Sequence, residues 1–503
     1  MGRGEKAFYN SSASLFAQAV AMISAFILPR LIMSNFGSSY NGITASVSQF
    51  LSVVTLLRSG IGGATRVSLY KALAEKDYKQ VSATINATQL FMRKIAKIFL
   101  LIIILFACVY PFFVKNEFSW LFSATLVLII SISTFVQYYF GITYYFLLQA
   151  DQKQYVSILF ETLSVILNVI LSVILIKIGC GIHIVKLGSA VAFCITPLAL
   201  FWYCNKKYPL DKEVKPDYSS IGQRWDALFH QIAAFIHNDT DIVLLTIFTT
   251  TKEISVYTVY YLVGNGVKKI LLTLSAGIES AFGDIIARRE EESLKQNLKM
   301  YETMIHYLSC VIWGTTIVLI TPFVKLYTAG ITDVSYNRLI FGYLVVVAEM
   351  LFCLRTPYEA IVNAAGHFKQ TKKYAMIEAG LNIVVSIVLV SKFGLTGVVI
   401  GTIVAITYKS IVFSRYSDMN ITKRSWLVTV KRYTITIVNM LCIIFVVNMF
   451  VRESINSYFG WACIAVPILC LSFVISTIIN FVFYKNEIVA TIKKIQSIFM
   501  RFL

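Results

Sequence analysis

The chain has 503 residues, of which 57% are hydrophobic and 14% are charged, and it carries a formal net charge of +19. Its mean hydropathy of +0.72 is too high for a soluble protein, because the surface of such a protein has to face water. The composition therefore excludes a soluble enzyme or a nucleic-acid-binding domain. It indicates an integral membrane protein in which the excess of Lys and Arg reports membrane topology.

Apolar stretches of about 20 residues recur along the whole chain, and each is long enough to cross a hydrocarbon layer of about 30 Å as a helix. Hydropathy therefore predicts an all-α integral membrane protein with about 14 transmembrane helices. In chain order, the predicted spans are residues 12–33, 42–64, 95–114, 119–140, 156–177, 183–204, 227–249, 255–282, 303–327, 338–361, 374–392, 395–414, 432–451 and 460–484.

The charged residues are divided unevenly between the connections of these spans. Basic residues concentrate in alternate connections, at residues 71–97, 205–224, 288–299, 367–373 and 415–432. Because cytoplasmic loops of membrane proteins are rich in Lys and Arg, both termini are expected in the cytoplasm. No connection exceeds about 30 residues, which leaves no room for an extramembrane catalytic domain, so the chain is not expected to be an enzyme.

A weak internal repeat divides the predicted spans into two halves. Asn168 and Ser172 in the fifth span correspond to Asn382 and Ser386 in the eleventh, at an offset of about 214 residues. Because polar positions coincide as well as apolar ones, we expect a duplication of six helices. Six helices return the chain to the same side of the membrane, so the two lobes should share one orientation, with a path between them.

The repeat and the loop charges together predict the domain layout. It consists of an N-terminal six-helix lobe (1–204), a cytoplasmic linker (205–226), a C-terminal six-helix lobe (227–414), a cytoplasmic loop (415–431), transmembrane helices 13 and 14 (432–484) and an amphipathic cytoplasmic tail (485–503).

Four of the basic residues within predicted spans are candidates for substrate binding. Arg58 lies near mid-depth of the second span, Arg30 near the outer end of the first, and Lys268 and Lys269 near the middle of the eighth. A charged side chain at the centre of a membrane costs about 3 kcal/mol or more, so such residues normally face a bundle interior or a water-filled path. An anionic substrate is therefore expected, although Arg30 could instead reach the outer interface.

Three acidic residues at depth, Glu349, Asp239 and Asp241, are candidates for proton or sodium coupling. The alternative for each acid is an ion pair with a buried cation. Asp239 and Asp241 are the partners expected for Lys268 and Lys269 in that case, whereas the sequence offers Glu349 no evident local partner.

Other polar residues of the spans suggest no further chemistry. Arg355 and Lys409 lie toward the cytoplasmic ends of their spans and are expected to anchor at the membrane interface. The nine Cys residues are scattered singly and the five His residues lack ligand spacing, so neither a metal site nor a catalytic residue is predicted. No cofactor is expected beyond a coupling proton or sodium ion.

Three features together resemble a known family. They are the two six-helix halves, the duplicated Leu-Asn segment, and the motif Leu57-Arg58-Ser-Gly-Ile-Gly-Gly-Ala-Thr-Arg of the second span. The chain resembles the polysaccharide-lipid flippases of the multidrug/oligosaccharidyl-lipid/polysaccharide exporter superfamily, and within it the O-antigen (Wzx-type) branch. Related flippases of lipid-linked peptidoglycan precursors place a cavity arginine after a Leu-Leu pair, and this resemblance implies the same role for Arg58.

The resemblance implies a transported substrate, a location and partners. The substrate would be an oligosaccharide repeat unit on undecaprenyl pyrophosphate, for O-antigen or a similar surface polysaccharide such as that of lipopolysaccharide. It would pass from the cytoplasmic to the periplasmic leaflet of the bacterial inner membrane by alternating access, through a cationic central cavity. Membrane lipids, a polysaccharide polymerase and a chain-length regulator are the partners implied.

Two alternatives stay open at this point. A multidrug or organic-cation antiporter of the same superfamily would need acids in the first half, where the first two spans offer Arg30 and Arg58 but no Asp or Glu. A polysaccharide polymerase or ligase of the same pathway usually has a large outer loop with catalytic Arg and His, and the outer loops here are short.

Overall fold

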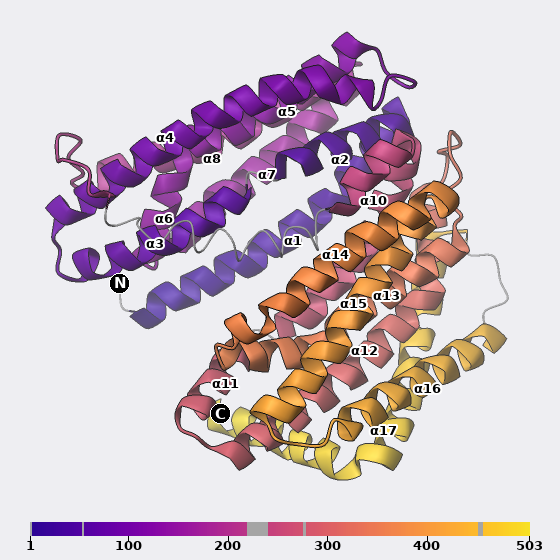
Figure 1. Ribbon diagram of the computed structural model, residues 1–503. Helices are drawn as coiled ribbons and strands as arrows, with labels where there is room; N and C mark the ends of the chain where they lie inside the picture. The colour runs from indigo at the N-terminus through magenta and orange to yellow at the C-terminus, as the bar shows by residue number, and fades with distance from the viewer. Residues whose placement is uncertain (1–2, 53–54, 219–239, 275–277, 451–455, 503) are drawn as a thin grey trace. The chain divides into compact units, whose positions relative to one another are not determined.

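The computed structural model describes residues 3–52, 55–218, 240–274, 278–450 and 456–502, and the elements in these ranges are all helical. Two compact units divide the chain, Met1–Ser255 and Val256–Leu503, here called unit 1 and unit 2. Figure 1 shows each unit as a set of long helices lying side by side, with unit 1 in indigo to magenta and unit 2 in salmon to yellow.

Unit 1 is a bundle in which α7 packs between α1 and α8, and α5 packs between α8 and α4. The helix pairs α1 and α2, α3 and α4, and α3 and α6 are also in contact. Its elements are α1 (Arg3–Phe36), α2 (Ser38–Ser52), α3 (Thr55–Ala74), α4 (Tyr78–Val109), η1 (Tyr110–Phe112), α5 (Trp120–Val136), η2 (Gln137–Gly141), α6 (Ile142–Ala150), α7 (Gln154–Lys177) and α8 (Ile182–Lys207).

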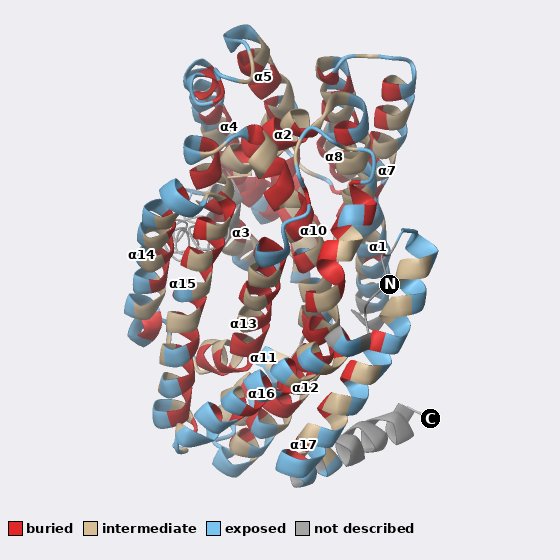
Figure 2. Ribbon diagram, turned by 90° about the vertical axis from the view of Figure 1, so that its right-hand side faces the viewer, coloured by how far each residue is buried: buried red, intermediate tan, exposed pale blue. Residues whose placement is uncertain are grey.

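Unit 2 is built around α12 and α13, which pack against each other. In addition, α12 packs against α16 and α17, and α13 packs against α15. In the most apolar stretch of α12, 61% of the residues are buried, compared with 17% in α17, so α12 is central and α17 has a side free to face lipid. Figure 2 shows buried residues along the length of α13. The elements are α10 (Thr251–Leu274), α11 (Ile278–Ala287), α12 (Glu291–Tyr327), α13 (Leu339–Ala364), α14 (Phe368–Phe393), α15 (Leu395–Tyr416), η4 (Ser417–Ile421), α16 (Leu427–Phe450) and α17 (Tyr458–Phe502).

Twelve helices in the described residues are long and apolar enough to cross a membrane. They coincide with twelve of the fourteen predicted spans, which confirms the all-α membrane class. The predicted span 42–64 is shared between α2 and α3, with residues 53–54 outside the description, and the span 227–249 is described only from residue 240. The domain bounds within this frame stay a prediction.

Local sequence explains where several helices begin and end. Asp77 accepts hydrogen bonds from the backbone N–H groups of Lys79 and Gln80, which satisfies free donors at the start of α4. Ser119 caps α5 in the same way. Between α14 and α15, Gly394 has a φ of +53°, which glycine adopts at low cost and which lets one helix follow the other directly.

The hairpin of α14 and α15 is packed so closely that two of its glycines have no room for a side chain. A Cβ at Gly397 would collide with the backbone of Leu389 and lie 2.8 Å from the nitrogen of Val390. A Cβ at Gly401 would collide with Ser386. By contrast, nothing lies within 4 Å of a Cβ built at Gly380 in α14. The close contact between α14 and α15 therefore requires glycine at positions 397 and 401.

We expect Gly397→Ala to lower the thermal midpoint of the purified protein, since overpacking against backbone costs about 1–3 kcal/mol. Gly380→Ala is the matched control in the same hairpin, and the higher helix propensity of Ala should leave its midpoint equal or raised. Equal midpoints for the two variants would contradict the close packing.

At one end of unit 1, Asp151 joins three separate parts of the chain. Its carboxylate lies 3.0 Å from Nζ of Lys6 in α1 and 2.6 Å from Nζ of Lys153, and it accepts a hydrogen bond of 2.5 Å from the hydroxyl of Tyr208. Burial alone would raise the pKa of this carboxyl, but the hydrogen bonds from Lys153, Tyr208 and Lys6 lower it below its ordinary value. The cluster fixes the start of α1 against the turn between α6 and α7.

The stabilising effect of Asp151 should depend on pH. Because its pKa is lower in the folded than in the unfolded protein, its contribution is complete above the unfolded value of about 3.9 and is lost as the pH falls through the lower folded value. Asp151→Asn should therefore lower the thermal midpoint at pH 7, and the difference from the unmodified protein should shrink below about pH 4. A difference that stays constant over this range would show that the carboxylate charge contributes nothing.

Candidate functional site

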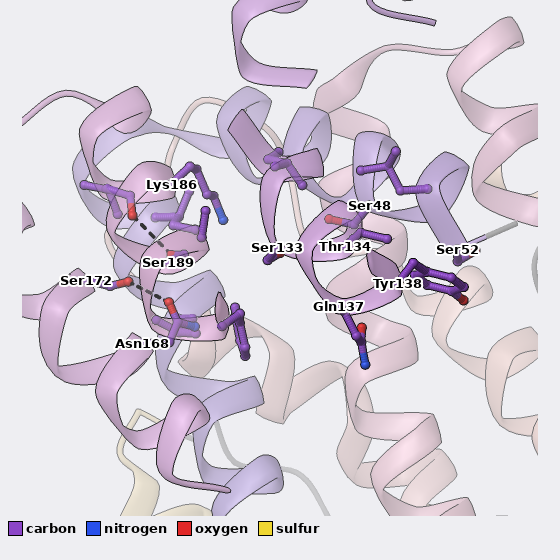
Figure 3. A pocket seen from close by; sticks show the side chains of 17 residues that line it. Ser48, Ser52, Ser133, Thr134, Gln137, Tyr138, Asn168, Ser172, Lys186 and Ser189 are labelled. Atoms are coloured by element: carbon purple, nitrogen blue, oxygen red, sulfur yellow. Dashed lines mark hydrogen bonds between the residues drawn. The ribbon is translucent and has the colours of Figure 1, made fainter. Parts of the chain in front are cut away.

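A cavity of about 320 Å³ lies within unit 1, between α1, α2, α5, η2, α7 and α8. We call it the unit 1 cavity, and Figure 3 shows it from close by. One part of its lining is apolar, from residues such as Leu28, Ile32 and Phe193. The other part is rich in hydroxyl and amide groups, which belong to Ser48, Ser52, Ser133, Thr134, Gln137 and further residues of α7 and α8.

A π-helical turn shapes one wall of the unit 1 cavity. The α-helical hydrogen bonding of α5 gives way to the π-helix η2 at Gln137, and α-helix resumes in α6. Such turns are rare and are frequent at functional sites. A Cβ at Gly141, the last residue of η2, would lie 2.7 Å from Cα of Pro197 in α8, so only glycine permits this approach. The close contact fixes the π turn against α8 and thereby sets the position of Gln137.

Several polar side chains of the cavity have hydrogen-bonding capacity to spare. Ser172 donates to Oδ1 of Asn168 at 3.4 Å, and Ser189 donates to a backbone carbonyl of its own helix, as the dashed lines of Figure 3 mark. The side chains of Ser133, Thr134 and Gln137 make no hydrogen bond to any other described residue. These three half-buried side chains are therefore available to a polar ligand or to water.

Lys186 of α8 supplies the only charge among the described residues that line the unit 1 cavity. Neither an ion pair nor a hydrogen bond joins its ammonium group to another described residue. No Asp or Glu occurs in the lining as described. An ammonium group away from bulk water favours an anion as partner. The cavity is therefore suited to a ligand that combines hydroxyl groups with negative charge.

The internal repeat shows that the unit 1 cavity is not a general property of the helix pair. All four residues are buried, but Asn168 and Ser172 line the cavity, whereas the corresponding Asn382 and Ser386 of unit 2 pack against α15. There Asn382 donates to Thr402 at 3.1 Å, and Ser386 donates to a carbonyl of α15 at 3.2 Å. The duplicated polar residues thus close a helix contact in unit 2 and face a space in unit 1.

The structure places only part of the predicted substrate-binding and coupling residues. The backbone of Arg58 lies in α3, but its side chain is outside the described part of the structure, as is Asp239 altogether. Arg30 in α1 is half-buried, Asp241 is buried in unit 1, and Lys269 in α10 is exposed. None of these three described residues lines the unit 1 cavity.

Lys268 and Glu349, predicted for substrate binding and for coupling, lie together in unit 2. Their ammonium and carboxylate groups are 2.8 Å apart, and Glu349 is almost fully buried. Lys268 also lies over the ring of Phe352 at 4.8 Å. The structure therefore gives Glu349 a cationic partner that the sequence did not identify. The two residues are 81 positions apart in the sequence, and the packing of α10 on α13 is what joins them.

The expectation that Arg355 and Lys409 anchor at the membrane interface is wrong. Arg355 is 2% exposed, and its guanidinium is 2.8 Å from Glu378 and 3.2 Å from Glu359. Lys409 bridges the same two carboxylates, at 2.8 and 3.4 Å. Two cations and two acids balance in this cluster, so it stabilises the contact between α13, α14 and α15 rather than offering a free charge.

Sequence analysis missed Lys186 and the polar lining around it. Lys186 is the fifth residue of α8, and such a position in an apolar helix normally indicates a side chain that reaches the interface. A usable signal was the spacing of its neighbours. Ser133 and Gln137 are four residues apart on α5 and η2, and Asn168 and Ser172 are four apart on α7, so each pair shares one helix face.

No model of a known protein family matches the sequence, and no curated protein matches it. Solved structures do. Lipid II flippase MurJ in an inward closed conformation is similar with a TM-score of 0.71 and 16% identity, over 95% of this chain and 99% of that one. An inward-facing multidrug resistance MATE family transporter of the MOP superfamily has a TM-score of 0.66 and 14% identity, over 80% and 94%. The Vibrio cholerae MATE transporter VcmN in the bent form has 0.53 and 13%, over 84% and 99%.

These similarities define the fold of the chain. It has the fold of a lipid flippase over 95% of its length, and the fold of a multidrug transporter over 80%. The predicted resemblance to this superfamily of exporters is thereby confirmed at the level of the fold. At 13–16% identity the comparisons do not extend to the transported substrate.

The Lys268–Glu349 pair leads to a double-substitution test. Lys268→Met should lower the stability of the purified protein by about 3 kcal/mol or more, because it leaves a buried carboxylate without its partner. Glu349→Gln should act in the same direction, and the double variant should recover most of the loss. Thermal midpoints in detergent measure the effect. Additive losses in the double variant would show that the two groups do not stabilise each other.

Proposed function

We propose that the protein is a flippase that moves undecaprenyl-pyrophosphate-linked oligosaccharides from the cytoplasmic to the periplasmic leaflet by alternating access. The observation that carries this proposal is the unit 1 cavity, which hydroxyl and amide groups line together with one lysine and whose described lining contains no acid. The fold shared with a lipid flippase supports it. We infer that the transported units are then assembled into a polysaccharide of the O-antigen type.

The chemistry of such a substrate agrees with the cavity. Sugars and a diphosphate lose their hydration in hydrocarbon at a high cost, so they need a polar path, whereas a polyprenyl chain remains in lipid. An organic cation would instead need a carboxylate, and the described lining of the unit 1 cavity holds a lysine in that place. The flippase is therefore preferred to the multidrug antiporter.

Binding of the diphosphate is assigned to Arg58, and coupling to the acids at depth. Arg58 retains this role from its position near mid-depth of the second span, with Arg30, Lys268 and Lys269 as further cationic candidates. Glu349, Asp239 and Asp241 are the proposed sites of proton or sodium coupling. For Glu349 the mechanism would be direct, because protonation of its carboxyl would release Lys268 from the ion pair at 2.8 Å.

The proposal includes a location and partners. Twelve apolar helices support a multi-pass membrane protein, and the distribution of Lys and Arg favours a bacterial inner membrane with both termini in the cytoplasm. A polysaccharide polymerase and a chain-length regulator would receive the translocated units. The chain itself is proposed to bind and move its substrate without changing it chemically.

The test is complementation of a strain that lacks its O-unit flippase. The intact gene should restore surface polysaccharide, and Arg58→Ala should abolish it with accumulation of the lipid-linked unit on the inner leaflet. Lys71→Ala is the matched control, because Lys71 is an exposed cation at the end of the same helix and its loss should leave transport unchanged.

Two outcomes would contradict the proposal. A fully active Arg58→Ala variant at normal expression would remove this arginine from the substrate path. If the intact gene left units on the inner leaflet while a polymerase-deficient strain regained long chains, the activity would be polymerisation and not transport.

A further inference from the structure

The unit 1 cavity offers less positive charge than a bound diphosphate requires. A diphosphate ester carries about two negative charges at neutral pH, which are normally held by several cations or by a metal ion. The described lining contributes one cation, Lys186, and no further Lys, Arg or His. One ammonium group matches one negative charge. The single lysine therefore points to a monoanionic group, not to the diphosphate.

The cavity is large enough for a sugar residue. A volume of about 320 Å³ corresponds to roughly ten water molecules at about 30 Å³ each, and because bonded atoms pack more densely than separate waters, one sugar ring with its substituents fits this space. A repeat unit of several sugars is larger. The mixed lining of apolar side chains, hydroxyls and an amide is suited to a ring with an apolar face and polar edges.

The polar groups are placed around Lys186 from several helices. Figure 3 shows Lys186 and Ser189 on one side of the cavity, with Ser133, Thr134 and Gln137 on α5 and η2 across from them. The last three have no hydrogen-bond partner among the described residues, and Gln137 offers both a donor and an acceptor. Such groups can bind sugar hydroxyls while the lysine binds an attached carboxylate.

The depth of the cavity also favours the sugar over the diphosphate. If both termini are cytoplasmic, Ile32 lies near the outer end of α1 and Lys186 near the outer end of α8. A diphosphate held by Arg58, near mid-depth of the second span, would leave the attached sugars to extend further toward the outer half of unit 1. The first groups to reach the outer half of unit 1 are therefore sugars.

We infer that the unit 1 cavity is a sugar subsite, in which Lys186 binds the carboxylate of one acidic sugar of the transported oligosaccharide. This inference rests on the proposed function and adds a substrate class, namely lipid-linked repeat units that contain a uronic acid or a similar carboxylated sugar. Ser133, Thr134 and Gln137 contact the hydroxyls of that sugar. The π turn and the Gly141–Pro197 contact position Gln137 for this purpose.

The experiment measures binding of small probes to the purified full-length protein by calorimetry at constant ionic strength. We expect glucuronate to bind at least tenfold more tightly than glucose. Lys186→Met should reduce this ratio to about one, whereas Gln137→Leu should weaken both sugars and keep the ratio. Lys177→Met is the matched control, since Lys177 is an exposed cation on the neighbouring α7 and does not line the cavity. Thermal midpoints establish that the variants are folded.

Other results would overturn the inference. Equal binding of glucose and glucuronate, or a ratio that survives Lys186→Met, would exclude a carboxylate at Lys186. If pyrophosphate bound more tightly than glucuronate, and Lys186→Met abolished that binding, the cavity would be a diphosphate site. Full displacement of glucuronate by chloride would identify a site for inorganic anions.

The outcomes are separable from those of the proposed function. If the intact protein bound glucose and glucuronate equally and the intact gene still complemented the deletion, the flippase function would be retained and only the acidic-sugar subsite would be rejected. Failed complementation with Lys186-dependent glucuronate binding would retain the sugar site and overturn the transport of polyprenyl-linked units.

Discussion

The structure depends on the high cost of an isolated charge away from water. In unit 2 this constraint is met by pairing, because Lys268 is joined to Glu349 and Arg355 to Glu378 at 2.8 Å each. The first pair links α10 to α13, which are far apart in the sequence, and the second links the consecutive helices α13 and α14, so the charges help to specify which helix faces meet. Lys186 of unit 1 differs from these cations, because no described residue forms an ion pair with it. That exception locates the candidate site.

The two units use duplicated residues for different purposes. In unit 2, glycines of α15 bring its backbone against α14, and Asn382 and Ser386 become part of a tight helix contact. In unit 1, the corresponding Asn168 and Ser172 are also buried, but they line the unit 1 cavity. One half of the repeat is thereby closed and the other retains a polar cavity.

Much of the fold could be predicted from the sequence because hydropathy depends on local composition. The spans at 156–177 and 183–204 were located within a few residues, as α7 and α8 show. Ion pairing could not be predicted, because Lys268 finds Glu349 only through the packing of α10 on α13. Lys186 was missed for a related reason. Its place near a helix start suggests an interfacial side chain, and only the cavity around it indicates another role.

The π turn at Gln137–Gly141 has a consequence for how one transmembrane segment serves two environments. In an unbroken α-helix, the stripe that contains Ser133 and Gln137 would continue through Tyr144 and Leu148, since these positions follow a period of 3.6 residues. The extra residue of the π turn rotates the later part by about 100°. Tyr144 and Leu148 therefore enter the apolar core of unit 1, while the earlier stripe stays polar beside the cavity. A single added residue separates a solvating surface from a packing surface within one continuous helix.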